Sequence, residues 1–188
     1  MTNDYGPRLL ALARQALQDH FAPKHPRRAK PREPWLRAPG ATFITLYHQR
    51  KLRGCIGSLQ ATKPLYRDLH DNAIHAATQD PRFPPLKAHE LPDIRLNISL
   101  LSPPQPLQIT DQADACQKLR PHQHGVILEL HTPTQYHNAT FLPQVWDQLP
   151  NPNDFLQALK HKAGLKQTGW DPRTTLQTYT VESWSEPD

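Results

Sequence analysis

Cys55 is the residue of this chain best suited to covalent chemistry. It lies in the stretch KLRGCIGS, residues 51–58, two positions after Arg53 and close to Gly54 and Gly57. In a β-strand alternate side chains share a face, so Arg53 and Cys55 are expected to point the same way. A neighbouring guanidinium favours the thiolate, which is the nucleophilic form of cysteine. The pattern therefore suits a reactive or ligand-binding site.

The same stretch also suits a tightly packed piece of the core. Free cysteine is among the most buried residue types. A glycine in a strand either opens room for a ligand against the backbone or marks a bulge or close packing. Spacing alone favours the packed thiol over the reactive one, and both interpretations stay open at this point.

A second group of candidate residues follows in NAIHAATQDPRFPP, residues 72–85. Asn72 and His75 are one helical turn apart, and Asp80 and Arg82 lie in a proline-rich turn. Asn72 and His75 are suited to serve a thiol as hydrogen-bond partner and base. The alternative is a solvated helix face for His75 and an Asp80–Arg82 pair that only braces the turn.

Motifs for metal and cofactor chemistry are missing from the sequence. The histidines between residues 122 and 137 lack the helical spacing of HExxH, and neither Cys55 nor Cys116 has a second cysteine at metal-binding spacing. No GxGxxG, P-loop or GxSxG stretch is present. We expect no metal site and assign no cofactor.

Composition predicts a basic, folded, cytoplasmic protein. The chain of 188 residues carries a net charge of +5, and it has 21 prolines and two cysteines. No stretch approaches the ~18 apolar residues of a membrane span, and the first residues lack a signal-peptide pattern. We therefore expect no membrane contact and two free thiols in a reducing cytoplasm. The basic, proline-rich residues 22–40 permit contact with nucleic acid, but their shortage of aromatic residues makes nucleic acid the less favoured partner.

Hydrophobic periodicity and turn signals predict an α+β fold with mostly antiparallel sheets. Helices are expected over residues 6–20, 64–79, 110–120 and 151–165. Strands are expected over residues 41–49, 51–59, 93–101, 125–130, 135–142 and 175–184, the first two forming a hairpin. Residues 22–40 are expected to be an extended connection, because proline blocks regular structure there.

Beyond this reasoning, seven stretches resemble one known family. In chain order they are GATFITL (40–46), LRGCIG (52–57), NAIHAATQDPRFPPL (72–86), EL…LNISLLSPPQPL (90–107), HGVILEL (124–130), FLPQVW (141–146) and FLQALKHKAGL (155–165). In this order they resemble the AMME-syndrome chromosomal-region gene one domain family, whose prokaryotic members are called AmmeMemoRadiSam system protein A. The chain departs from the family at the turn HQRK, 48–51, where members often carry a glycine.

The resemblance implies that residues 1–188 are a single family domain. It implies an α+β fold of a larger and a smaller lobe, packed intimately, with the LRGCIG segment near a cleft between them. It also implies a Memo-type protein and a radical SAM enzyme as partners. It does not imply an activity.

Two functions remain on this basis. The first is an enzyme component that uses Cys55 as nucleophile, with Arg53, Gly54, Gly57, Asn72, His75, Asp80 and Arg82 as the binding shell. The second is a binding or adaptor module in which the LRGCIG segment shapes a groove and the thiol forms no bond. The sequence does not identify a small-molecule or peptide ligand for either.

Overall fold

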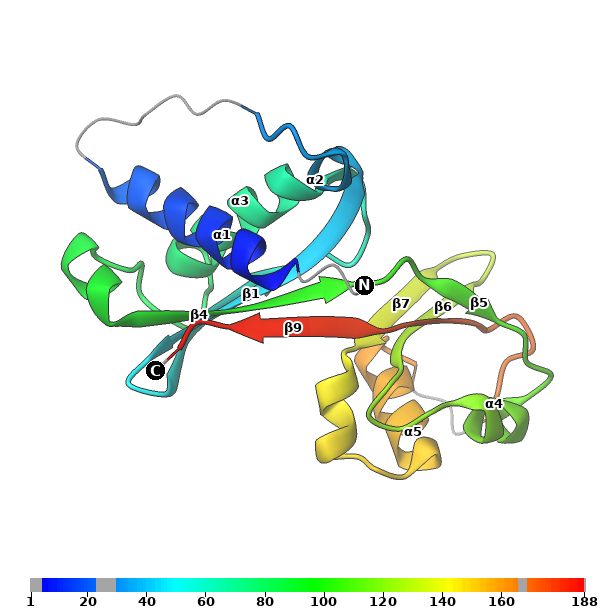
Figure 1. Ribbon diagram of the computed structural model, residues 1–188. Helices are drawn as coiled ribbons and strands as arrows, with labels where there is room; N and C mark the ends of the chain where they lie inside the picture. Colours follow the sequence, from blue (N-terminus) through cyan, green and yellow to red (C-terminus); the bar gives the residue numbers. More distant parts are fainter. Residues whose placement is uncertain (1–4, 23–29, 166–168, 188) are drawn as a thin grey trace. The chain divides into compact units, whose positions relative to one another are not determined.

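The computed structural model describes residues 5–22, 30–165 and 169–187 and has an α+β fold (Figure 1). The chain divides into two compact units. Unit 1 comprises Met1–Leu101 and Glu182–Asp188, and unit 2 comprises Ser102–Val181. Each unit has its own sheet and its own hydrophobic core.

Unit 1 is a five-stranded sheet with two long helices on one face (Figure 1). Its main strands run in the order β2-β1-β4-β9, and the short β3 pairs with the beginning of β1. Strand β1 pairs antiparallel with both β2 and β4. The strands are β1 (Pro39–His48), β2 (Lys51–Gly57), β3 (Lys63–Pro64), β4 (Ile94–Leu101) and β9 (Val181–Ser185). The helices are α1 (Gly6–Phe21) and α3 (Leu65–Thr78), with the one-turn α2 (Pro34–Arg37) and the 3-10 helix η1 (Ala88–Asp93).

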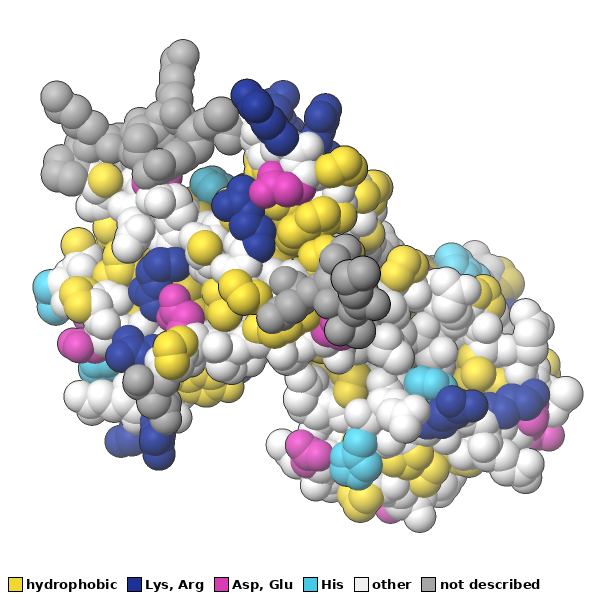
Figure 2. All heavy atoms as spheres, viewed as in Figure 1, with side chains coloured by type: hydrophobic (Ala, Val, Ile, Leu, Met, Phe, Trp, Pro, Cys, Tyr) yellow, Lys and Arg dark blue, Asp and Glu magenta, His cyan; other side chains and the backbone are white. Residues whose placement is uncertain are grey.

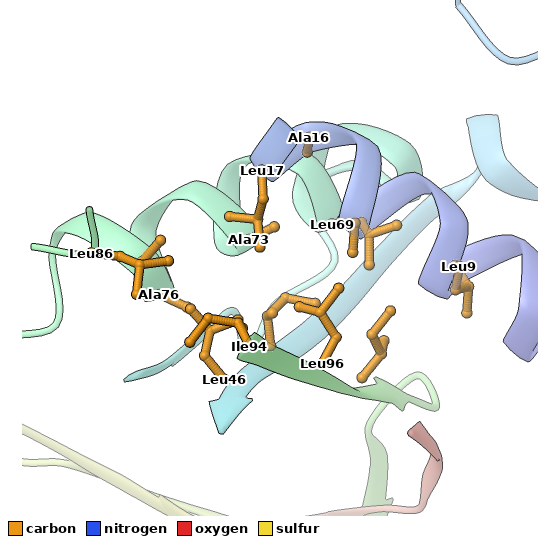
Figure 3. Packing of buried hydrophobic residues seen from close by; sticks show 14 of the residues in the cluster. Leu9, Ala16, Leu17, Leu46, Leu69, Ala73, Ala76, Leu86, Ile94 and Leu96 are labelled. Carbon is orange, nitrogen blue, oxygen red and sulfur yellow. The ribbon is translucent and has the colours of Figure 1, made fainter. Parts of the chain in front are cut away.

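The core of unit 1 lies between this sheet and the two helices. Alternate residues of β4, among them Ile94 and Leu96, are buried, as the sequence pattern predicts. Figure 3 shows these side chains and Leu46 of β1 pointing toward Leu17 of α1 and Leu69 of α3. Burial of these aliphatic side chains fixes β1 as a central strand, and β2 is thereby placed at the edge of the sheet.

Unit 2 is a four-stranded antiparallel sheet in the order β5-β8-β6-β7. Its strands are β5 (Gln105–Leu107), β6 (Gly125–His131), β7 (Tyr136–Phe141) and β8 (Thr175–Tyr179). Its helices are α4 (Gln112–Lys118), the 3-10 helix η2 (Pro143–Asp147) and α5 (Pro152–Lys162). The core is centred on Trp146 of η2, whose ring stacks on Phe155 of α5 with centroids 3.7 Å apart.

The four predicted helices are present with shifts of a few residues at their ends. Asp111 caps α4, since its carboxylate accepts a hydrogen bond from the Asp114 N–H at 2.9 Å. Gly164 follows α5 with φ of +77°, the left-handed conformation that glycine adopts readily at a helix end. The expected cleft between two lobes stays a prediction, as does the single family domain over residues 1–188.

Two expected elements differ in the structure. The single strand expected over residues 175–184 is two strands, β8 and β9, in two different sheets. Thr180 separates them because its N–H and C=O both bond to Ser102, at 2.9 Å each. The connection expected to be extended over residues 22–40 contains α2, which proline permits because it begins at Pro34. Residues 23–29 of that connection lie outside the described residues.

Candidate functional site

Cys55 lies on β2, at the edge of the unit 1 sheet, opposite Thr45 of β1. The pairing of the two strands shifts between Leu46, which faces Gly54, and Tyr47, which faces Leu52. Arg53 is therefore an extra residue in β2, a β-bulge. The bulge breaks the strict alternation of side chains along the strand at Arg53. The expected proximity of Arg53 to the thiol depended on that alternation.

Cys55 forms hydrogen bonds with three different residues of the described chain. The thiol accepts one from the Thr45 hydroxyl at 3.3 Å. The backbone N–H donates to the Asp80 carboxylate at 2.8 Å, and the backbone carbonyl accepts from Arg82 Nη2 at 3.5 Å. Because β2 is an edge strand, these side chains satisfy backbone groups that would otherwise face outward unpaired.

Asp80 and Arg82 form a bidentate ion pair beside Cys55. Arg82 Nε donates to one carboxylate oxygen at 2.9 Å and Nη2 donates to the other at 2.7 Å. The Asp80 side chain is 2% exposed, whereas the Arg82 side chain is 55% exposed. A buried carboxylate therefore holds an exposed guanidinium in a fixed position.

The pairing of Asp80 with Arg82 shifts the pKa values of both residues. Hydrogen bonds from Arg82, and then from the Cys55 N–H, hold the pKa of Asp80 well below its usual range, against the opposing effect of burial. The pKa of Arg82 is raised, first by its hydrogen bond to Asp80 and in smaller part by the charge of Cys55 and a hydrogen bond with it. Arg82 is thus the arginine held beside Cys55, where its Nη2 donates to the backbone carbonyl.

Arg53 fastens a neighbouring part of the same edge. Its guanidinium donates to the two carboxylate oxygens of Glu90 at 3.0 and 3.2 Å and to the Pro84 carbonyl at 2.9 Å. This pairing lowers the pKa of Glu90. Together with Asp80 and Arg82, it ties residues 80–90, hereafter the edge segment, to β2.

The two glycines of the motif are required for close packing. A Cβ atom on Gly54 would overlap the backbone carbonyl oxygen of Ala76, near the end of α3. A Cβ atom on Gly57 would overlap the ring of Phe43, its cross-strand neighbour on β1. Of the two roles that the sequence left open for these glycines, close packing is the one seen.

Asn72 belongs to a different, buried group. Its amide nitrogen lies within hydrogen-bond distance of Asp68 Oδ2 at 3.0 Å, the Thr42 carbonyl at 3.0 Å and Ser58 Oγ at 3.1 Å. Asp68 also accepts from the N–H and the hydroxyl of Thr42, both at 2.8 Å. This group joins α3 to β1 where β2 has ended, so the partners of Asn72 are structural ones and not the thiol.

His75 is half-buried on α3, and its ring makes no hydrogen bond to the residues that the structure describes. The structure thus brings Cys55, Asp80 and Arg82 into one hydrogen-bonded group, with Arg53 fastening the same segment. The sequence reasoning missed Thr45 and Glu90. Counting across the hairpin turn would have placed Thr45 wrongly because of the bulge at Arg53, and nothing near Glu90 marks it as a partner.

Metal-binding clusters and membrane-spanning helices are both absent from the described parts of the chain. Within residues 5–22, 30–165 and 169–187, no three His, Cys, Asp or Glu side chains are grouped so as to hold a metal ion. None of the helices seen in those ranges is long and apolar enough to cross a membrane.

Comparison with known proteins gives consistent matches along the chain. Residues 10–184 match the model of the AMMECR1 family. A protein of Methanothermobacter thermautotrophicus is 35% identical over 99% of this chain and 96% of its own length. One of Thermotoga maritima is 37% identical over 85% of this chain and 84% of its own. The crystal structure of an uncharacterised Pyrococcus horikoshii protein superposes with a TM-score of 0.80 at 28% identity, covering 99% of this chain and 93% of that one.

Proposed function

The chain belongs to the AMMECR1 family, and on this premise we propose that the β2 edge around Cys55 is its functional surface. The protein is a component of an enzyme system in which the Cys55 thiol takes part in group transfer or modification. The observation that carries the proposal is the setting of the thiol. It accepts a hydrogen bond from Thr45, and Arg82 donates to the backbone carbonyl of the same residue, on a strand fastened at its edge by Asp80.

The Thr45 hydroxyl donates to the sulfur, and the Arg82 guanidinium is bonded to the backbone carbonyl of the same residue. A hydroxyl donor and a guanidinium both stabilise negative charge on sulfur. Asp80 restrains Arg82 from leaving the site, because both of its carboxylate oxygens are engaged by the guanidinium. The exposed remainder of Arg82 is suited to contact an anionic group of the substrate.

Partners and location follow from the family resemblance rather than from contacts within the chain. A Memo-type protein and a radical SAM enzyme are the proposed partners, in the cytoplasm. The LRGCIG segment, residues 52–57, is proposed to border the cleft where the ligand binds. Gly54 and Gly57 shape this surface through their packing, and His75 is the candidate base.

A second function, a non-catalytic adaptor, is favoured by a specific observation. Gly54, Gly57 and Arg53 each have a structural partner within unit 1, namely Ala76, Phe43 and Glu90. A motif in which these three members have structural partners shapes a surface without needing bond formation at the thiol. The two functions differ in one measurable property, which is the reactivity of Cys55.

Alkylation by iodoacetamide measures this reactivity, because the thiolate displaces iodide and the adduct is counted by mass spectrometry. The protein carries Cys116→Ser so that only Cys55 reacts. We expect labelling of the folded protein, slowed several-fold by Arg82→Gln and by Thr45→Val. Arg173→Gln breaks a matching Asp–Arg pair in unit 2 and should leave the rate unchanged. Complete protection of Cys55, or equal rates in all four proteins, would favour the adaptor.

A further inference from the structure

A groove on the helical side of unit 1 has no part in the site around Cys55. It lies along α1 and α3 and has a volume of about 1170 Å³. Leu12, Ala16 and Ile74 give it an apolar lining, and the segment Lys30–Glu33 lies along its rim. This space, hereafter the helix groove, is larger than the ~300–1,000 Å³ typical of small-molecule pockets.

The carboxylates that line the helix groove are already engaged. Glu33 accepts from Arg8 Nε at 2.8 Å, and Asp71 accepts from Lys63 Nζ at 2.8 Å. Asp19 accepts from the Gln15 side-chain amide at 2.8 Å. Glu33 and Asp71 are thus each paired with a cation and are not available to the other cations of the groove.

Three of those cations are exposed and have no carboxylate partner among the described residues, namely Lys30, Arg32 and Arg67. The surrounding sequence strengthens the bias, since residues 22–40 contain six Lys and Arg residues and one acidic residue. Figure 2 shows dark blue side chains gathered over the segment that precedes α2. The groove thus combines an apolar lining with a positive rim.

We propose that the helix groove binds an acidic, amphipathic helix of a partner protein. An apolar strip between the side chains of two helices suits a partner helix that presents its apolar face. Complementary charge at the rim selects acidic partners and speeds their association. Single-stranded nucleic acid fits less well, because it needs several aromatic surfaces for stacking. The groove offers one, Tyr66, and the Arg67 guanidinium already lies over its ring, 5.9 Å from the centroid.

The test uses a fluorescent synthetic peptide of about four helical turns, with Leu along one face and Glu elsewhere. A second peptide has the same composition with its Leu residues scattered, and an oligouridine of similar charge represents RNA. Binding to the full chain is followed by fluorescence anisotropy at low and at physiological salt. The groove variant is Arg32→Glu/Arg67→Glu, and its matched control is Lys51→Glu/Arg120→Glu, which reverses two exposed cations elsewhere.

We expect the amphipathic peptide to bind more tightly than the scattered one, and the groove variant to weaken it about ten-fold. The control should weaken it less than about two-fold at physiological salt, where distant charges are screened. Ile74→Asn, which adds no charge, should weaken binding without changing the salt dependence, with its folding verified by circular dichroism. The proposal is overturned if the amphipathic peptide does not bind at low salt, or if the two peptides bind equally. It is also overturned if the groove variant and its matched control weaken binding equally. Tighter binding of the oligouridine, affected by the groove variant, would overturn it as well.

Discussion

The carboxylate of Asp80 accepts a hydrogen bond from the backbone N–H of Cys55 at 2.8 Å. This bond joins the turn after α3 to the exposed edge of β2, and Arg82 reinforces it from the same turn. The Asp80–Pro81–Arg82 turn has a counterpart in unit 2. Asp171–Pro172–Arg173 makes the same three bonds within the turn, to the Arg backbone N–H, Nε and Nη2. What distinguishes Asp80 is its burial and its bond to Cys55.

Asp80→Asn should therefore destabilise the protein by about 2 kcal/mol in urea unfolding at neutral pH. The change removes a buried charge that accepts several hydrogen bonds, and each charge-assisted bond is worth ~1.5–3 kcal/mol. Asp171→Asn is the matched control, since it changes the same turn where the carboxylate side chain is 26% exposed rather than 2%, and it should cost clearly less. Equal losses in the two variants would mean that the bond to Cys55 contributes nothing.

The stability that Asp80 contributes should also depend on pH. Because the folded-state pKa of Asp80 is lowered, its contribution to stability is full above the unfolded value of about 3.9 and is lost as the pH falls below it. The difference in unfolding free energy between wild type and Asp80→Asn should be constant from pH 5 to pH 7, by this reasoning, and should shrink below about pH 4. Urea titrations at a series of pH values measure it. A difference that grew on acidification would contradict the assignment.

Gly54→Ala should be among the most destabilising single-methyl additions in the chain. The added Cβ would meet the backbone carbonyl oxygen of Ala76, which cannot rotate away as a side chain can. Overpacking typically costs ~1–3 kcal/mol, and the backbone position of the obstacle places Gly54→Ala at about 3 kcal/mol. Gly169→Ala is the control, because no atom of the non-adjacent described residues lies within 4 Å of its Cβ position. A cost for Gly54→Ala no larger than that for Gly169→Ala would show that β2 and α3 separate easily.

Much of the fold follows from local pattern. The alternation in residues 93–101 and the helical spacing in residues 6–20 correspond to β4 and α1, because burial of one face determines both. Ser99 departs from the pattern. Strict alternation with the buried Ile98 would place it toward solvent, yet it is buried, with its hydroxyl 2.9 Å from that of Ser183. Its neighbour is β9, far away in sequence, and pairing with a distant strand leaves no trace in local periodicity.

The sequence indicated which residues form the candidate site, but it did not indicate all of their hydrogen-bond partners. Cys55, Asp80 and Arg82 all stand out in the sequence, and the structure joins them. The pairing of Arg53 with Glu90 did not follow, because a bulge has no reliable local signal and redirects one side chain. Arg82, not Arg53, is the arginine that bonds to Cys55, through its backbone carbonyl, and only tertiary structure decides between two arginines at different sequence distances.

Gly57 and Phe43 provide a test of cross-strand packing. The Phe43 ring covers Gly57, an arrangement in which an aromatic ring shields a glycine in a neighbouring strand. Gly57→Ala should cost about 1–2 kcal/mol, because the ring must move and a side chain moves more easily than backbone. In the background Phe43→Ala the same change should cost much less. The double-mutant cycle in urea unfolding gives the coupling free energy, and a value near zero would contradict direct packing of the ring on Gly57.

The hairpin turn between β1 and β2 offers a stabilising change. Gln49 and Arg50 both have positive φ, 50° and 64°. Glycine, asparagine and aspartate adopt such angles readily, whereas other residues adopt them at a cost in free energy. Two consecutive residues of this kind form the turn type that prefers Asn-Gly. Gln49→Asn/Arg50→Gly should therefore stabilise the protein by about 1 kcal/mol, measured as a shift of the urea midpoint with unchanged slope. Lys51→Gly is the control, because it places glycine at the first strand position and should destabilise instead. If both glycine variants destabilise the protein alike, the turn carries no strain and the positive φ values are not what limits this hairpin.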